Sequence, residues 1–164
     1  MTPDDPVVRE FVATSLVARV ATRSRTGAPA LTPLWFVADG AHLYTTTGQA
    51  TLAARNAKAS PEVVILLDGE AAGPREHALR LRGRATVRGE LPAWRVLARF
   101  AVKYYLGGFA SELRHARQWR LRQRYYAQGR IAVIEFAPES AELLRRPADA
   151  GGHPGHPGGP APAG

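Results

Sequence analysis

Four threonines near the middle of the chain supply hydroxyl groups in a pattern that suits an anion. Thr45, Thr46 and Thr47 are followed by a glycine and then by Thr51, which precedes a helix-forming run over Leu52–Lys58. A threonine in this position caps the first helical turn, and the N–H groups of that turn have no partners within the helix. Hydroxyls and helix-start N–H groups together bind anions. The sequence therefore predicts a phosphate site here, although the same threonines also suit an ordinary strand edge.

A β-hairpin is expected to position this threonine loop. Asp39 and Gly40 tolerate the positive φ values of a two-residue turn, so Leu31–Val37 and His42–Thr46 are predicted to pair. Other strands are indicated by β-prone runs bounded by turn residues. Their ranges are Leu16–Thr22, Glu62–Asp68, Leu79–Arg88 and Ile131–Phe136. Short strands linked by turns are typical of a small closed barrel, so the expected fold is mainly β with helical additions.

Two of these strands carry distinctive patterns. Glu62–Asp68 is a continuous apolar run, which predicts a central strand covered on both faces. In Leu79–Arg88, apolar residues alternate with Arg80, Arg82 and two further arginines, which predicts an inward apolar face and an outward row of cations. Such a row is typical of a solvated strand face, and a ligand groove is the alternative.

Apolar residues at helical spacing predict three more helices. Their ranges are Pro6–Ala13, Trp94–Tyr105 and Ala110–Tyr126. The last contains five arginines and several aromatic residues, a composition that suits phosphate or nucleic acid as well as a solvated face. Residues 147–164 are nearly all Pro, Gly, Ala and His and are expected to be disordered, which leaves residues 1–146 as one folded domain. His153 and His156 lack the further ligands that a metal needs, so no metal site is predicted.

Composition limits the class of protein. The chain has 164 residues, 45% of them hydrophobic, which is enough for one domain with a core. Basic residues exceed acidic ones by 22 − 14 = 8, which favours an anionic partner, although GC-rich coding also enriches arginine. The lack of cysteine excludes disulfides and thiolate chemistry, and no carboxylate pair or nucleophile elbow supports hydrolysis. No run approaches the roughly 20 apolar residues of a membrane span. Because the start is acidic rather than basic, a cytoplasmic location without membrane association is expected.

A family resemblance rests on the order and spacing of these elements. It covers Val17–Asp68, VARVATRSRTGAPALTPLWFVADGAHLYTTTGQATLAARNAKASPEVVILLD, and continues in the strand Leu79–Ala85, LRLRGRA. This pattern resembles the pyridoxamine 5'-phosphate oxidase-like split β-barrels, which include flavin- and deazaflavin (F420)-dependent oxidoreductases. The resemblance implies a split barrel of six to seven strands and a homodimer with FMN or F420 at the subunit interface.

The resemblance also implies positions for the cofactor. The ring would lie along the second strand, at Thr32, Pro33, Leu34, Trp35 and Phe36, whose backbone groups meet its polar edge. Its phosphate would lie at the threonine loop, which agrees with the anion site inferred from the residues themselves. Trp35 and Phe36 also suit a plain core.

One departure from the family pattern concerns charge. Members commonly carry a basic pair directly after the residue that opens the helix, and here those positions are Leu52 and Ala53. Arg55 and Lys58, which follow in the same helix, are candidates to replace that pair, and Arg80 or Arg82 of the arginine row is another. Without a replacement, phosphate affinity falls, because a charge-assisted hydrogen bond contributes about 1.5–3 kcal/mol.

Three functional hypotheses follow. The first is an FMN- or F420-dependent oxidoreductase acting on a small organic substrate. The second is a non-catalytic carrier of flavin, F420 or haem on the same fold, which the residues at Leu52 and Ala53 favour. The third is a nucleic-acid or polyanion-binding module, for which composition is the sole support.

Overall fold

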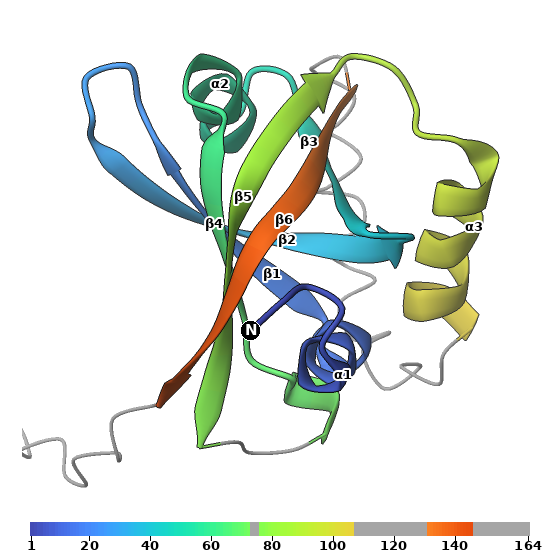
Figure 1. The fold of residues 1–164 in the computed structure, drawn as a ribbon. Coiled ribbons are helices and arrows are strands. Elements are labelled where there is room, and N and C mark those ends of the chain that lie inside the picture. The colour runs from blue at the N-terminus through green and yellow to red at the C-terminus, as the bar shows by residue number, and fades with distance from the viewer. Residues whose placement is uncertain (73–75, 107–130, 146–164) are drawn as a thin grey trace, which may run out of the picture.

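A closed barrel of six antiparallel strands dominates the computed structural model, which describes residues 1–72, 76–106 and 131–145 (Figure 1). The neighbours around the barrel follow the order β1-β2-β3-β6-β5-β4. The strands are β1 (Val17–Arg23), β2 (Pro29–Asp39), β3 (His42–Gly48), β4 (Glu62–Leu67), β5 (His77–Arg88) and β6 (Ile131–Arg145). The predicted mainly β barrel is therefore confirmed, with six strands.

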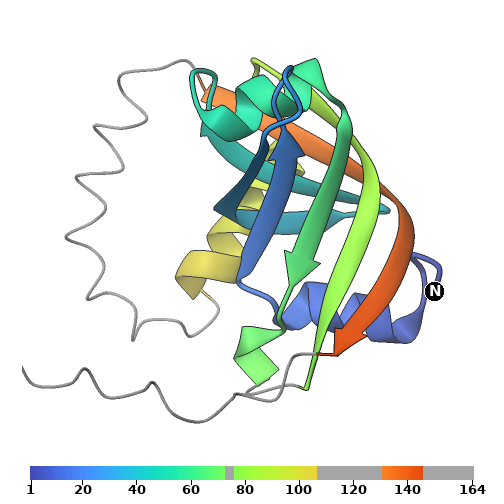
Figure 2. The same ribbon diagram turned by 90° about the vertical axis from the view of Figure 1, so that its left-hand side faces the viewer.

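Short helices close the barrel at its two ends. They are α1 (Pro6–Thr14) and α2 (Leu52–Ala59), which lie at opposite ends in both views (Figures 1 and 2). Val8 and Phe11 of α1, and Ala53 and Ala57 of α2, join the buried cluster formed by the inward side chains of the strands. The predicted helices at both positions are confirmed. Thr51 caps α2 as expected by accepting from the N–H of Ala54, and Asp5 caps α1 by accepting from that of Val7.

A third helix lies outside the barrel, beside the β2–β3 turn (Figure 1). It is α3 (Trp94–Ala101), and the chain continues from it into a π-helical turn, η2 (Val102–Leu106). A 3₁₀ turn, η1 (Glu70–Ala72), follows β4. Among the described residues, no helix has the length and apolar composition that crossing a bilayer requires.

The alternation predicted for β5 is present. Leu79, Leu81 and Ala85 point into the barrel, and the arginines between them point outward. Three of these arginines pair with acidic side chains on the adjacent strands. The pairs are Arg80–Glu142, Arg84–Glu62 and Arg88–Glu135. The row thus behaves mainly as a solvated, ion-paired face.

Two details, the β2–β3 turn and the covering of β4, differ from the expectations. The β2–β3 turn consists of Gly40 and Ala41, one residue later than predicted, and only Gly40 has a positive φ, of 59°. Glycine at the first turn position suits a type II′ hairpin turn. Strand β4 is fully covered only on its inward face, because Val64 and Leu66 remain partly exposed. The predicted helix over Ala110–Tyr126 and the predicted disordered tail over 147–164, with its two histidines, lie outside the described residues.

The last strand is much longer than the predicted Ile131–Phe136, since it runs to Arg145. Pro138 follows the predicted end of the strand, and a proline normally interrupts a strand ladder. A register shift opposite Arg82 and Gly83 accommodates Pro138, and β6 then continues along β5. Gly83 makes this possible because a Cβ there would overlap the carbonyl oxygen of Ala137 and lie 2.9 Å from the Cα of Pro138.

This close approach predicts that Gly83→Ala strongly destabilises the barrel. Forcing a methyl group against fixed backbone costs about 1–3 kcal/mol or more, which denaturant unfolding followed by circular dichroism will measure. The matched control is Arg82→Ala at the neighbouring exposed position, where a change within about 0.5 kcal/mol is expected. Equal stability of the two variants would contradict the role of the close contact.

Candidate functional site

The ladder between β2 and β3 is interrupted next to the threonine loop. β2 pairs with β1 from Pro29 to Trp35, but with β3 only from Phe36 to Asp39. β3 nevertheless continues to Gly48, paired with β6 on its other side. Within the described residues no strand pairs with the second edge of β2 between Pro29 and Leu34. We call this interruption, bordered by residues 29–34 of β2 and 46–48 of β3, the split.

The split brings together most of the residues that the sequence singled out. Thr32, Pro33 and Leu34 lie on the β2 border, and Trp35 lies where β2 changes partners. Thr46 and Thr47 lie on the β3 border, Thr45 directly precedes them, and Thr51 starts α2 immediately beyond. The predicted neighbourhood of strand, threonine loop and helix start is therefore present.

The threonine hydroxyls are largely used within the loop itself. Thr51 Oγ1 lies 2.8 Å from the carbonyl oxygen of Gly48, to which it donates, and 3.1 Å from Thr47 Oγ1. Because Thr51 has one proton and gives it to Gly48, Thr47 must donate to Thr51. The first-turn N–H groups of Leu52 and Ala53 are then the principal remaining donors for an anion. The buried Thr45 Oγ1 has no hydrogen-bond partner among the described residues.

Burial explains the absence of a basic residue at one of the two positions after Thr51, that of Ala53. Ala53 is fully buried in the core cluster, so a long charged side chain has no room there, whereas Leu52 is about half exposed. Arg55 and Lys58 lie on the exposed side of α2, and the described part of the chain shows no ion pair for either. These two cations are the ones that α2 itself offers to an anion at the split.

Arg80 is placed differently. It pairs with Glu142 and lies opposite it on β6, whereas Thr47 lies opposite Ala132. Ten β6 residues separate these two positions, which corresponds to roughly 30 Å along a strand. Within one chain, the structure therefore does not bring Arg80 to the threonine loop.

Tyr104 lies at the position where β2 leaves β1. The sequence interpretation treated this residue only as one apolar position of a helix. Its hydroxyl accepts the N–H of Phe36 at 2.9 Å and lies 2.8 Å from the carbonyl oxygens of both Phe36 and Leu16. With one proton, the hydroxyl donates to one of these carbonyls at a time. The ring stacks on Trp35 with centroids 4.6 Å apart and planes 8° from parallel. Burial raises the pKa of Tyr104 well above its usual range, so the hydroxyl stays protonated.

The hydrogen bonds of Tyr104 determine which backbone groups of β2 remain available to a cofactor ring. The backbone groups of Phe36, which the family resemblance assigned to the polar edge of a cofactor ring, are bonded to Tyr104. The remaining backbone edge for a ring is that of Pro29–Leu34. No local sequence signal marks Tyr104 for this task, because its partners lie 68 and 88 residues away.

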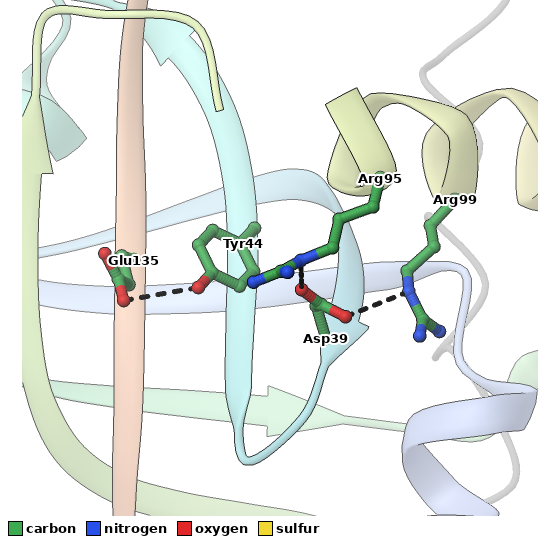
Figure 3. Close-up of polar contacts among 5 residues, drawn as sticks. All are labelled: Asp39, Tyr44, Arg95, Arg99 and Glu135. Carbon is green, nitrogen blue, oxygen red and sulfur yellow. Dashed lines mark hydrogen bonds and ion pairs between the residues drawn. The ribbon is translucent and has the colours of Figure 1, made fainter. Parts of the chain in front are cut away.

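Ion pairs fix α3, and with it the segment that carries Tyr104. Asp39 at the end of β2 accepts from Arg95 at 2.8 Å and from Arg99 at 3.2 Å, one turn apart on α3 (Figure 3). Beside this cluster, Tyr44 donates to Glu135 at 3.2 Å (Figure 3). Burial and the Glu135 carboxylate raise the pKa of Tyr44. Opposite charges thus hold α3 against the β2–β3 hairpin.

Comparisons with known proteins identify related chains. The family model described as pyridoxamine 5'-phosphate oxidase matches residues 5–145. No curated protein matches the chain. Solved structures do match, and those described below have identities that establish the fold alone.

Three of these structures are informative. The Agrobacterium tumefaciens protein Atu2129, of unknown function, is 20% identical with a TM-score of 0.61. The match covers 84% of this chain and 55% of Atu2129, so this chain spans only about half the length of that protein. An F420 reductase is 19% identical with a TM-score of 0.53, over 82% of this chain and 94% of the other. The haem storage protein HutZ of Vibrio cholerae is 17% identical with a TM-score of 0.58, over 88% of this chain and 95% of the other.

The hydrogen bonds between the Tyr104 hydroxyl and the backbone of Phe36 form a bridge from the α3 segment to β2. Tyr104→Phe is therefore predicted to destabilise the protein by about 1–3 kcal/mol, because it leaves buried backbone groups of β2 without a partner. Tyr44→Phe is the matched control, since it removes a hydroxyl with a single side-chain partner, and a loss of about 0.5–1 kcal/mol is expected. Urea unfolding measures both. A Tyr104→Phe variant no less stable than Tyr44→Phe would show that the bridge contributes little.

Proposed function

Because the chain belongs to the pyridoxamine 5'-phosphate oxidase family, we propose that it binds FMN or F420 at the split and acts as an oxidoreductase on a small organic substrate. The observation that supports this proposal best is the change of strand partners in β2. It leaves a backbone edge at Pro29–Leu34 beside the start of α2, so that a planar ring and a phosphate have sites at the same opening.

The residues at the split suit such a cofactor. The N–H groups of Leu52 and Ala53 point toward the phosphate position, and Arg55 follows one turn later in α2, from where it reaches back toward the helix start. The backbone of Thr32–Leu34 offers alternating donors and acceptors, apart from the missing N–H of Pro33, to the polar edge of a ring. When bound, the flavin or deazaflavin ring supplies hydride-transfer chemistry, and the protein binds and orients it and its substrate.

A second candidate function is favoured by the same site. Thr47 and Thr51 use their hydroxyl protons within the loop, and the buried Ala53 adds no cation, so the helix start itself offers little charge to a phosphate. A site of this kind also suits a non-catalytic carrier of flavin, F420 or haem. The fold similarity to a haem storage protein is compatible with this alternative.

We further propose a homodimer in which the partner covers the split. Leu31 on the β2 border is 56% exposed and Leu52 at the helix start is 49% exposed, so two large apolar side chains face solvent beside the opening. Burying such residues between two copies removes apolar surface from water, and it encloses a cofactor that one chain alone leaves open.

A thermal-shift titration with FMN, F420 and haem tests the proposed function. A ligand at about 100 times its Kd adds roughly 2.7 kcal/mol, which corresponds to a rise in Tm of about 5–10 °C for a chain of this size. A rise with FMN or F420, followed by turnover of the reduced cofactor, supports the oxidoreductase. A rise with haem alone supports the carrier, and no rise with any of the three contradicts both.

Arg55→Ala is predicted to weaken FMN or F420 binding about tenfold, because it removes the charge that replaces the missing basic pair. The control is Arg25→Ala in the β1–β2 turn, which leaves affinity unchanged. Flavin or deazaflavin fluorescence measures both variants, and an unaltered Kd for Arg55→Ala would exclude Arg55 from the site.

Light scattering tests the dimer. The chain has a mass of 17.7 kDa, so a dimer is expected at 2 × 17.7 = 35.4 kDa. Leu31→Asp is predicted to shift the mass toward the monomer, because it places a charge in the apolar interface, whereas Arg25→Ala leaves it unchanged. A wild-type mass of one chain would contradict the proposed dimer.

A further inference from the structure

A cavity of about 620 Å³ lies at the end of the barrel away from the split, between α1, the β2–β3 hairpin and α3. Its walls are mostly apolar and include Val8 and Val12 of α1, Leu43 of β3 and Ala98 of α3. The cavity has the size of a small-molecule site. α1 and α2 lie at opposite ends of the barrel (Figures 1 and 2), so this cavity is separate from the proposed cofactor site.

One cation stands out in this wall. Lys103 lines the cavity, and its ammonium lies 3.8 Å from the ring centroid of the buried Phe36. No carboxylate pairs with Lys103 among the residues that the structure describes. Burial lowers the pKa of Lys103 to about 8, and the more distant Glu70 opposes this shift. A half-buried ammonium without a carboxylate is costly, and an anionic ligand would offset that cost.

The other charged groups around the cavity largely cancel. Arg99 lines it too, but Asp39 at the end of β2 holds this arginine at 3.2 Å. Arg9 and Asp4, near α1, lie on its exposed side and have opposite signs. Lys103 is therefore the half-buried cation of this wall that has no carboxylate in an ion pair among the described residues, and Glu70 acts on it electrostatically.

We propose that this cavity binds a small amphipathic monocarboxylate, with its apolar body between α1 and α3 and its carboxylate on Lys103. One ammonium in apolar surroundings matches one negative charge, whereas a dianionic phosphate would bring a second charge without a partner. The apolar walls require a ligand with a hydrocarbon or aromatic body, because a fully polar anion would lose hydration without compensation.

The proposal determines how binding depends on pH. The carboxylate binds the protonated amine, and Lys103 loses its proton as pH rises through its pKa of about 8. The other charged groups that face it are Glu70 of η1, Asp39 of β2, Arg99 of α3, and Asp4 and Arg9 near α1. Because Lys103 loses its proton, affinity for a carboxylate falls between pH 7 and 9.5, and affinity for a neutral analogue does not.

Calorimetric titration with octanoate and octanamide tests this site. Wild-type protein is expected to bind octanoate at least tenfold more tightly than octanamide at pH 7, and to lose most of that preference at pH 9.5. Lys103→Met is expected to remove the preference, whereas Lys103→Arg keeps it and abolishes its pH dependence. Ala98→Trp, at an exposed position that lines the cavity, blocks both ligands, and Arg25→Met in the distant β1–β2 turn changes neither.

Circular dichroism verifies that each variant is folded. Should Lys103→Met fail to fold, the wild-type comparison of the two ligands and the Ala98→Trp variant still decide the matter. Equal affinity for octanoate and octanamide, no octanoate binding, or undiminished binding to Ala98→Trp would each overturn the proposal.

Discussion

The change of partners in β2 is the constraint on which the rest of the structure depends. A six-stranded barrel closes here only because β2 leaves β1 after Trp35 and joins β3 from Phe36. Backbone groups at such a junction would be buried without partners, at a cost of about 1–3 kcal/mol each. The hydroxyl of Tyr104 satisfies them, and the Trp35–Tyr104 stack adds apolar contact. The segment that follows α3, outside the barrel, is therefore part of what fixes the junction at which β2 changes partners.

Ion pairs occupy several of the cations that the structure describes. Within the described residues, arginines of β5 pair with acids on β4 and β6, and two arginines of α3 share one aspartate of β2. The two lysines of the chain are different. Lys58 lies on α2 near the split, and Lys103 lies in the cavity at the opposite end. Each end of the barrel thus has a cation that no carboxylate neutralises among the described residues, and the two suit different anions.

Local patterns in the sequence were sufficient for most of the fold. Alternation predicted β5, turn residues predicted the β2–β3 hairpin, and Thr51 predicted the start of α2, because these features depend on neighbours within a few residues. The length of β6 was missed, since Pro138 fits a strand only where Gly83 on another strand leaves room. Likewise, the sequence identified the threonine loop as a helix start. The three-dimensional arrangement was needed to show that Thr47 and Thr51 use their hydroxyl protons within the loop. Tyr104 and Lys103 were missed as site residues because their partners are distant in sequence.

The most direct test of the proposed cofactor site is an NMR titration of ¹⁵N-labelled protein with FMN and with F420. Binding at the split predicts that the largest amide shifts fall on Leu52 and Ala53 at the start of α2 and on Leu31, Thr32 and Leu34 of β2, with small shifts in α1. Largest shifts in α1 and around Lys103, or no shifts at millimolar cofactor, would contradict the assignment of the split as the cofactor site.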